Sequence, residues 1–405
     1  MSRMDRRSFL RAVARAGLSA AALASFPPAL RAALAAAKPA AGAAPDTSGP
    51  PEMIVRNDRP EHWETTLEAL GRSWITRNDR FFVRSHLSVP TPDLDAWRLE
   101  VSGLVHSPLS LTLAQARALP LETDAVTLEC AGNGRGLMKL PSTAGTQWGR
   151  GAVGNASWTG VRLARLLERA GVAPEAKHVW FEALDQATFP GPPPFLRSIP
   201  IEKAMDDVLL ALAMNDERLS PLHGAPLRAI VPGWYGMAST KWVTRVRLED
   251  HPSDSFFMAK GYHYVYPGED PAAAPPVETM RVKSVITRPI DGSEVQLAPR
   301  TDNKKKPRLR VQGFAWAGPA GVRLVEVSSD GGKSWFPAGF MGDMAKGAWR
   351  AWATEFEVTP PARFALMARA TGNDGDVQPL EARPNGSGYA NNSIHKVTVR
   401  VRLAT

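Results

Sequence analysis

The sequence predicts an α+β fold that is followed by a β-sandwich, and three observations support this prediction. Up to about residue 250, strand-like runs alternate with patterns of helical period. A Pro/Ala-rich stretch at Pro267–Pro276 then indicates a linker. Beyond residue 280 almost every run is strand-like. A chain of 405 residues is long enough for two or three domains, each with its own core.

The N-terminal segment has the order of charged and apolar residues of a signal peptide. Residues 5–11 are DRRSFLR, an Ala/Leu-rich run follows over 12–23, and small residues lie at 35–37. The paired arginines before Phe9 resemble the twin-arginine signal, which exports proteins that have already folded. The alternative is a membrane-spanning helix, but the run is too short and alanine-rich to cross about 30 Å of hydrocarbon. We therefore expect residues 1–37 to be a signal and the mature protein to be periplasmic.

The mixed domain is expected to begin with an extended Pro/Gly/Asp-rich arm over Ala41–Pro60 and to contain two helices. Thr112 can cap a short helix that ends near Leu119. Apolar residues at helical spacing predict a longer helix over Trp158–Ala170, which Gly171 would stop. Six strand-like runs complete the domain: Trp97–Val105, Ala125–Glu129, His178–Ala183, Val208–Ala213, Leu227–Val231 and Trp242–Leu248.

The region after residue 280 has the spacing of a β-sandwich of the immunoglobulin type. The triplet Asp330-Gly331-Gly332 predicts a hairpin, because glycine adopts positive φ angles without strain. The single cysteine excludes the disulfide of antibody domains but leaves the architecture open. Seven strands are expected: Val282–Thr287, Leu309–Ala315, Val322–Ser328, Ser334–Phe340, Trp349–Val358, Phe364–Thr371 and Lys396–Leu403.

Composition excludes several classes of protein. With 44% hydrophobic and 22% charged residues the chain has the composition of a globular protein. One cysteine excludes intrachain disulfides, zinc ribbons and iron–sulfur clusters. The net charge is +9, but residues 1–37 hold six arginines and one aspartate, so only +4 remains elsewhere. The basic run 304–306 is expected to be a solvated loop, and we expect no nucleic-acid partner and no membrane span in the mature chain.

The lone cysteine, Cys130, ends a strand-like run and opens a loop of small residues, Ala131–Gly136. A thiolate in such a loop is a soft ligand for a soft metal. A small buried apolar side chain is the alternative role for a lone cysteine. A phosphate-binding loop is a weaker alternative, because the GxGxxG pattern needs glycine where Leu137 stands. The remaining histidines show no short ligand spacing, and we assign them no metal role.

Three separated motifs resemble the sulfite oxidase family of molybdopterin enzymes. They are FVRSHLSVP at 82–90, ECAGNGRG at 129–136 and VPGWYGMASTKW at 231–242. Two later motifs, KSVITRP at 283–289 and VSSDGGKSW at 327–335, resemble the C-terminal dimerisation domain of that family.

This resemblance implies a sulfite-oxidase-type molybdopterin domain over residues 38–275 and an immunoglobulin-like dimerisation domain over 280–405. It also implies one molybdopterin per chain, a possible homodimer, and sulfite as a small anionic substrate. We expect no haem in this chain, so it is similar to bacterial sulfite dehydrogenases, which pass electrons to a separate c-type cytochrome.

The resemblance also implies roles for individual residues. Cys130 matches the cysteine that ligates molybdenum. Arg84 and Arg135 match arginines of the anion pocket, where a planar guanidinium can hold two oxygens of the substrate. Trp148 matches a wall of that pocket. Tyr262 matches a tyrosine that hydrogen-bonds a ligand of the metal, with Tyr264 as a rival. Six further residues match positions that hold the pterin and its phosphate: His86, Asp185, His223, Arg228, Ser239 and Lys241.

One position departs from the pattern. The segment Asn385–His395 resembles a loop that brings an arginine to the pocket in the animal enzymes, and here Ser387 stands at that position. Arg383 could compensate. The sequence therefore predicts oxidation of sulfite to sulfate, with two alternatives. One is an enzyme of the same superfamily acting on another sulfur compound or as a reductase, for example on methionine sulfoxide; the other is a non-catalytic periplasmic binding protein.

Overall fold

The computed structural model describes residues 52–138, 143–185, 193–298 and 306–404. The predicted signal at 1–37, the first part of the predicted arm, and Lys304 and Lys305 lie outside these ranges. Within the described ranges, no helix is long and apolar enough to cross a membrane.

A small antiparallel sheet begins the mixed region and carries Arg84. Its strands are β1 (Met53–Asn57), β2 (His62–Thr65) and β3 (Val83–Arg84), paired in that order. The described end of the predicted arm is therefore partly a strand, because β1 pairs with β2. Helix α4 (Leu67–Leu70) and the 3-10 turn η1 (Asn78–Arg80) connect β2 to β3.

A second, antiparallel sheet positions Cys130. Strand β6 (Glu122–Glu129) ends directly before this residue and pairs along its whole length with β7 (Val153–Arg162). The strand order is β11-β10-β7-β6, and β12 also pairs with β10. The other strands of this sheet are β10 (Leu209–Met214), β11 (Glu217–Arg218) and β12 (Arg228–Ile230). The predicted strands at 125–129, 208–213 and 227–231 are thereby confirmed.

The helix predicted over 158–170 was wrong in its first five residues. Residues 158–162 continue strand β7 and pair with both β6 and β10, and only Leu163–Ala170 forms helix α6. Trp158 and Val161 are both buried, so the strand has apolar residues on both faces and its pattern cannot be told from that of a buried helix. The stop at Gly171 is confirmed, since this residue ends α6 with a φ of +69°.

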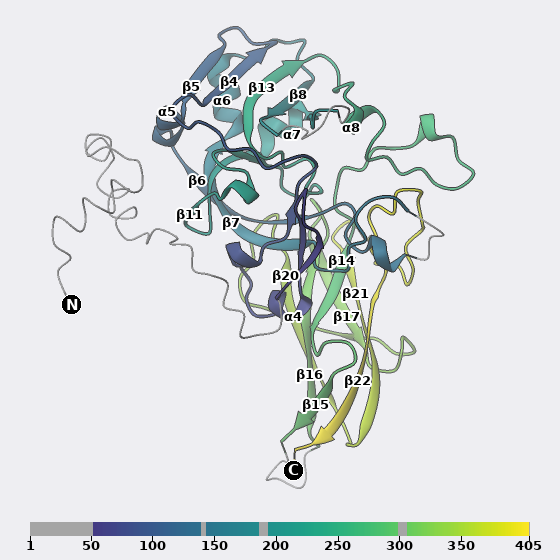
Figure 1. The fold of residues 1–405 in the computed structure, drawn as a ribbon. Helices are drawn as coiled ribbons and strands as arrows, with labels where there is room; N and C mark the ends of the chain where they lie inside the picture. The colour runs from purple at the N-terminus through teal and green to yellow at the C-terminus, as the bar shows by residue number, and fades with distance from the viewer. Residues whose placement is uncertain (1–51, 139–142, 186–192, 299–305, 405) are drawn as a thin grey trace, which may run out of the picture. The chain divides into compact units, whose positions relative to one another are not determined.

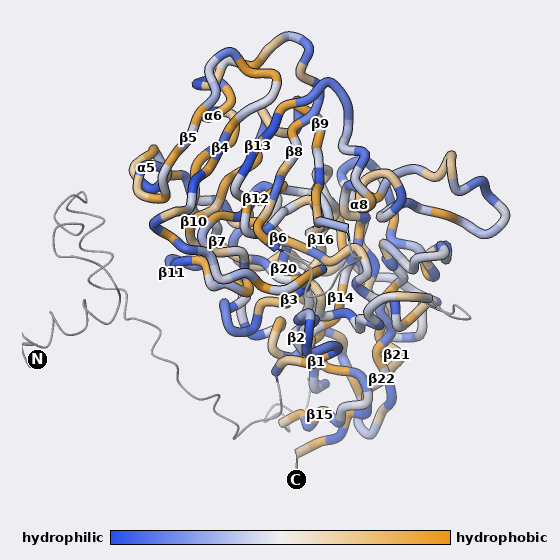
Figure 2. Tube along the Cα trace, turned by 45° about the horizontal axis from the view of Figure 1, so that its top comes forward, coloured by the Kyte–Doolittle hydropathy of each residue, from blue (hydrophilic) through white to orange (hydrophobic). Residues whose placement is uncertain are grey.

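The third sheet has the strand order β5-β4-β13-β8-β9, which can be followed in Figure 2. Strands β4 and β13 run parallel, and the other pairs are antiparallel. The predicted cap is confirmed: the Thr112 side chain accepts from the backbone of Gln115, and the Gln115 side chain accepts from the backbone of Thr112. The elements are β4 (Arg98–Gly103), β5 (Leu109–Thr112), α5 (Leu113–Ala118), β8 (His178–Ala183), β9 (Arg197–Pro200), α7 (Ile201–Asp206) and β13 (Val243–Glu249).

Apolar side chains of this sheet, of α6 and of β10 and β12 form the largest core of the mixed region. Leu163, Leu167 and Val246 are completely buried in it. Because the buried side chains of several strands and of α6 pack together there, this core holds the sheets in place relative to one another.

Residues after the linker form two sheets with a shared apolar core, which confirms the predicted β-sandwich (Figure 1). One sheet has the order β14-β16-β20-β19, and the other has the order β15-β22-β21-β17-β18. Helix α8 (Phe256–Ala259) and the 3-10 turn η4 (Pro271–Ala273) lie between β13 and this region. The strands are β14 (Lys283–Arg288), β15 (Glu294–Leu297), β16 (Arg308–Trp316), β17 (Val322–Ser328), β18 (Phe336–Pro337), β19 (Gly339–Met341), β20 (Arg350–Glu357), β21 (Ala362–Gly372) and β22 (His395–Leu403).

Two predictions in the sandwich need correction. The single strand expected over 334–340 is two short strands, because β18 pairs with β17 in one sheet and β19 pairs with β20 in the other. Pro337 lacks the N–H that a continuous ladder needs, which favours this crossing between sheets. Strand β15 was not predicted. The hairpin at Asp330 is confirmed, with Gly331 and Gly332 at φ angles of +76° and +95°.

Candidate active site

One cavity brings together residues from the three sequence motifs at 82–90, 129–136 and 231–242. It encloses about 630 Å³ of non-protein space, open mouth included, which is the size of an ordinary cofactor or ligand pocket. Eight of the predicted site residues line it: Arg84, His86, Cys130, Asp185, Arg228, Ser239, Lys241 and Tyr262. The other described lining residues are Phe82, Ala131, Phe195, Leu222, Gly236, Met237, Thr240 and Trp242.

The Cys130 loop is a tight turn held by backbone hydrogen bonds. Cys130 N donates to the Ala152 carbonyl at 2.9 Å, and Asn133 N donates back to the Cys130 carbonyl at 2.8 Å. Gly134 adopts a φ of +87°, and a Cβ there would lie 3.0 Å from the Asn391 side chain, so the turn requires glycine. The loop therefore holds the cysteine at a fixed place on the cavity wall.

Burial raises the pKa of the Cys130 thiol, whereas the positive charges of Arg84 and Arg135 act in the opposite direction. Arg84 is partly buried, lines the same cavity and donates a hydrogen bond to the Ser85 carbonyl. A thiolate at this position would be favoured further by a bound cation. Burial is the largest of these influences, so a thiolate at Cys130 depends on the two arginines and on a bound metal together.

A second wall of the cavity is positively charged. Lys241 Nζ donates to Ser85 Oγ at 3.0 Å and to the Leu222 carbonyl at 3.1 Å, both of which are neutral acceptors. Burial, with a smaller contribution from Arg228, lowers the pKa of Lys241 well below its usual range. Burial also lowers the pKa of Arg228 to about 9.

These cations have spare hydrogen-bonding capacity. Arg228 Nη1 donates to the His223 carbonyl at 3.2 Å, but Arg228 Nε has no partner among the described residues. Asp185 Oδ1 also has no partner there, and burial raises the pKa of this carboxyl to about 6, with Lys241 opposing the shift. Gly224, at a φ of +107°, leaves room beside Lys241 and Arg228 that a Cβ would fill. Buried cations with unpaired donors fit a phosphate-bearing cofactor.

Tyr262 and His86 form a hydrogen-bonded pair on the cavity wall. The Tyr262 hydroxyl lies 2.6 Å from His86 Nε2, and the His86 ring stacks on Phe195 at 4.1 Å between centroids. Burial lowers the pKa of His86 well below its usual value, so the imidazole is neutral at pH 7, and burial raises the pKa of Tyr262. Its rival Tyr264 does not line the cavity; it stacks against Tyr266.

Three predicted site residues lie behind the cavity wall. Arg135 is buried, with Nε donating to the Ser387 carbonyl at 2.7 Å and its guanidinium 5.2 Å from the centre of the Tyr389 ring. Trp148 is almost completely buried beside the His62 ring. His223 contacts the Asn78 carbonyl at 2.9 Å through Nε2, and burial lowers its pKa to about 4.

The C-terminal loop supplies no substitute for the missing arginine among the described residues. It is the Ser387 carbonyl, and not its side chain, that contacts Arg135. Arg383 is exposed, pairs with Glu269 at 2.5 Å and lies over the Tyr266 ring. Neither Ser387 nor Arg383 is among the residues that line the cavity.

Arg197 is a candidate that the sequence analysis missed. It is 2% exposed, its guanidinium lies 5.3 Å from the centre of the Tyr262 ring, and its Nε has no partner among the described residues. Burial lowers its pKa to about 10. Arg197 stands in β9 outside every motif, so only a long-range contact identifies it. Phe195 was missed for the same reason.

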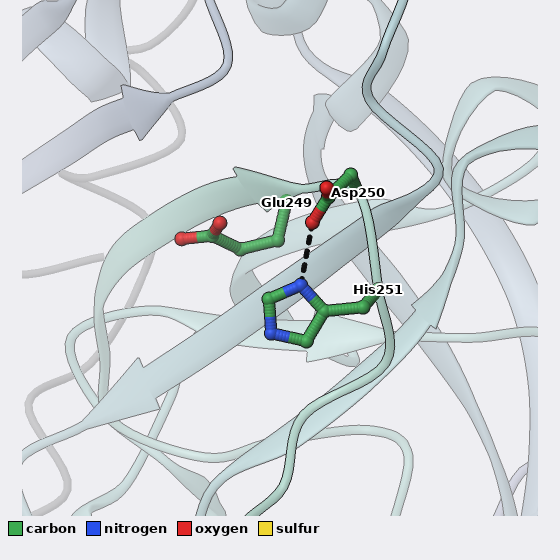
Figure 3. A group of neighbouring side chains, drawn as sticks. All are labelled: Glu249, Asp250 and His251. Carbon is green, nitrogen blue, oxygen red and sulfur yellow. Dashed lines mark hydrogen bonds and ion pairs between the residues drawn. The ribbon is translucent and has the colours of Figure 1, made fainter.

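A surface group of three residues offers metal-ligand atoms away from the cavity lining. Glu249, Asp250 and His251 are shown in Figure 3, where His251 Nδ1 lies 2.6 Å from Asp250 Oδ1. The carboxylate of Glu249 is paired with Arg247 at 2.9 Å. Asp250 and His251 are exposed, and nothing beyond their proximity indicates a ligand, so we assign no site here.

Comparison with known protein families agrees with this geometry. Residues 86–257 match the oxidoreductase molybdopterin binding domain, and residues 274–402 match the Mo-co oxidoreductase dimerisation domain. The fold and the cavity thus define a molybdopterin oxidoreductase with a C-terminal dimerisation domain. The chain belongs to the sulfite oxidase family.

Individual relatives show the extent of the match. The chain is 36% identical over 365 residues to the mitochondrial sulfite oxidase of Drosophila melanogaster, covering 85% of this chain but 62% of that protein. It is 31% identical over 382 residues to the sulfite oxidase of Arabidopsis thaliana, covering 87% and 94%. It is also similar to the solved structure of the sulfane dehydrogenase SoxCD from Paracoccus pantotrophus, with a TM-score of 0.74, 30% identity, and coverage of 92% and 96%.

Proposed function

We propose that this protein oxidises sulfite to sulfate at a molybdenum held by Cys130 and passes the electrons to a separate c-type cytochrome. The observation that carries the proposal is the position of the Cys130 thiol in one cavity with Arg84, Arg228 and Lys241. A soft ligand beside buried cations suits both a molybdenum–pterin group and an anionic substrate. Membership in the sulfite oxidase family supports the same reaction.

The basic wall would hold the cofactor. Arg228 Nε has no partner among the described residues and Lys241 contacts only neutral acceptors, so both could bind phosphate oxygens, while Ser239 and Asp185 would add polar contacts for the pterin. The bound group would supply the redox centre and the oxygen that is transferred. The protein contributes the placement of this group and the exclusion of bulk water.

Substrate binding and proton transfer would involve Arg84, Tyr262 and His86, which line the same cavity as Cys130. Arg84 offsets the charge of the substrate and hydrogen-bonds its oxygens, while Arg135, behind the wall, adds positive potential. The Tyr262 hydroxyl would donate a hydrogen bond into the cavity, with neutral His86 at 2.6 Å as its proton partner.

Sulfite-dependent reduction of cytochrome c or ferricyanide by purified, molybdenum-loaded protein tests the proposal. We expect turnover with sulfite. In Arg84→Gln we expect the apparent KM for sulfite to rise at least tenfold, and an unchanged KM would remove Arg84 from the substrate site. Arg98→Gln, which changes an exposed arginine bonded only to nearby carbonyls, is the matched control.

Oxidation of another sulfur compound is the second candidate, and the Ser387 position favours it. If this loop supplies an arginine to the substrate site in sulfite-oxidising relatives, its absence here would favour a substrate of lower charge than sulfite. The similarity to a sulfane dehydrogenase supports the same alternative. Thiosulfate and sulfide as electron donors, and methionine sulfoxide as an acceptor, would be assayed in parallel. Turnover on one of these without turnover on sulfite would select this candidate.

Export and assembly form a separate part of the proposal. The paired arginines at 6–7 support export to the periplasm by the twin-arginine route. Replacing both by lysine should leave the protein in the cytoplasm, as cell fractionation would show, and continued export would contradict this route. The C-terminal domain supports a homodimer, which the mass in solution would test.

A further inference from the structure

The carboxylate of Glu129, the residue before Cys130, is bound by residues from the C-terminal sandwich. Lys283 Nζ in β14 lies 2.7 Å from Glu129 Oε1, and Trp316 Nε1 in β16 donates to Glu129 Oε2 at 2.8 Å. Asn133 Nδ2, from the other end of the turn, donates to Oε1 at 2.9 Å. The Glu129 and Lys283 side chains are 1% and 2% exposed. The carboxylate is therefore fully bonded and withdrawn from water.

The geometry of the strand links this pair to the cavity. Successive residues of a strand point to opposite sides, so Glu129 extends into the sandwich while Cys130 faces the cavity. Asn133 closes the turn: its Oδ1 accepts from Ala152 N at 3.2 Å, and Ala152 also accepts the hydrogen bond of Cys130 N. A displacement of the Glu129 carboxylate would therefore move both ends of the turn.

A second set of contacts from the same domain holds the other side of the loop. Ala390 N donates to the Ala131 carbonyl at 2.7 Å, and Asn391 Nδ2 donates to the Gly134 carbonyl at 2.7 Å. Described residues from 52 onward belong to one compact unit, in which these bonds join β6 and its loop to the sandwich. The C-terminal domain thus contacts the cysteine loop on two sides.

We infer that Lys283 and Trp316 are positioning residues for Cys130, so that the C-terminal domain sets the geometry of the metal ligand in addition to its proposed role in a homodimer. This inference rests on the proposed role of Cys130 as the molybdenum ligand and is independent of the substrate. Neither residue lines the cavity, so each acts through Glu129.

The test is the electron paramagnetic resonance spectrum of molybdenum(V), formed by partial reduction of the holoenzyme with dithionite. Its g-values depend on the angle and distance of the sulfur ligands. Lys283→Met should shift the g-values while molybdenum content stays within twofold of the original protein. Trp316→Phe, which removes one N–H from Glu129, should produce a smaller shift in the same direction. Glu129→Gln combined with Lys283→Met removes both charges and should restore the spectrum at least in part.

Lys203→Met is the matched control. It too removes a lysine from an ion pair, here a less buried one between Lys203 in α7 and Asp207 at 2.5 Å, and among the described residues no hydrogen bond or ion pair joins these two to the cysteine loop. Its spectrum should equal that of the original protein.

An unchanged spectrum in a molybdenum-loaded Lys283→Met variant would overturn the inference. If that variant fails to fold, unchanged spectra in Trp316→Phe and in the double variant would overturn it equally. An unchanged spectrum in Cys130→Ser would instead overturn the assignment of Cys130 as the metal ligand. Absence of sulfite turnover would contradict the proposed substrate, but it would overturn neither the assignment of Cys130 nor the positioning role of Lys283 and Trp316.

Discussion

Two buried lysines, one in each region of the protein, differ in the groups that their ammonium nitrogens contact. Lys241 opens on the cavity, and its ammonium group contacts a serine hydroxyl and a backbone carbonyl. Lys283 lies in the sandwich, and its ammonium group contacts the carboxylate of Glu129 at 2.7 Å. Burial lowers the pKa of both, but at Lys283 the charge of Glu129 opposes the shift as the second-largest influence.

The difference separates a binding site from a structural contact. An ammonium group in a cavity without a bonded carboxylate is costly in the empty protein and becomes favourable when an anion binds. A buried pair with complete hydrogen bonding is stable without a ligand, and it becomes costly only when one partner is removed. We therefore expect substitutions around Lys241 to affect the ligand and substitutions around Lys283 to affect the fold and the loop.

The largest expected effect is on the cofactor content of Lys241→Met. Because the Lys241 ammonium group contacts only neutral acceptors and would pair with the phosphate, we expect molybdenum and pterin per protein to fall at least tenfold. Inductively coupled plasma mass spectrometry and pterin fluorescence after release would measure both. Retention of more than half of the cofactor would show that Lys241 is not part of the phosphate site, whereas Lys203→Met should retain all of it.

The second effect is on the free energy of unfolding, which we expect to fall when Lys283 is replaced but not when Lys241 is replaced. In cofactor-free protein, Lys283→Met should lower the free energy of unfolding by about 3 to 5 kcal/mol, since it leaves Glu129 buried and unpaired. Lys241→Met should leave this free energy unchanged or raise it, because a poorly paired charge is removed. Urea unfolding followed by tryptophan fluorescence would compare the two, and equal losses would contradict the distinction.

A third, smaller effect concerns pH. The pKa of Asp185 is raised to about 6 from its usual 3.8, so the folded, cofactor-free protein binds more protons than the unfolded chain between these values. The contribution of Asp185 to the free energy of unfolding is fully present below about pH 4 and is lost as the pH rises through about 6. The difference corresponds to about 2 to 3 kcal/mol. Asp185→Asn should lack this component when unfolding free energies are measured at pH 4 and pH 7, and identical pH dependence in both proteins would contradict the shift.

The smallest effect is a control for the others, because the side-chain partner of Thr112 is Gln115 and neither lysine. Thr112→Ala removes the cap of α5 and should lower the free energy of unfolding by about 1 kcal/mol. Cofactor content and activity should not change. A loss of cofactor in this variant would mean that content follows general stability, and the Lys241→Met result could then not be attributed to the site.

The sequence predicted what depends on local pattern and failed where distant residues decide. Thr112 and Gly171 mark helix ends by their own chemistry, and both were predicted correctly. Residues 158–162 were predicted as helix because strand pairing on both sides, which no local window contains, buries both faces. The predicted strand at 334–340 failed for another reason, because Pro337, a local signal that was overlooked, favours the crossing between two sheets.

The site shows the same limit. Residues inside a motif, such as Arg84, Cys130 and Lys241, could be predicted, and the structure brings them into one cavity. Arg197 could not, because it lies in no motif. Lys283 was noticed only as part of a motif of the second domain, and its contact with Glu129 spans 154 residues. A contact between residues so far apart in the sequence depends on how the two domains pack. The spacing of residues within a motif does not predict it.

The central claim is that Cys130 binds the metal at which sulfite is oxidised. The most direct test measures sulfite-dependent reduction of cytochrome c by the original protein and by Cys130→Ser, both purified from a host that makes the molybdenum cofactor. We predict steady turnover by the original protein and a loss of at least a hundredfold in a folded Cys130→Ser variant. Near-normal sulfite oxidation by Cys130→Ser, or no sulfite oxidation by the molybdenum-loaded original protein, would contradict the account.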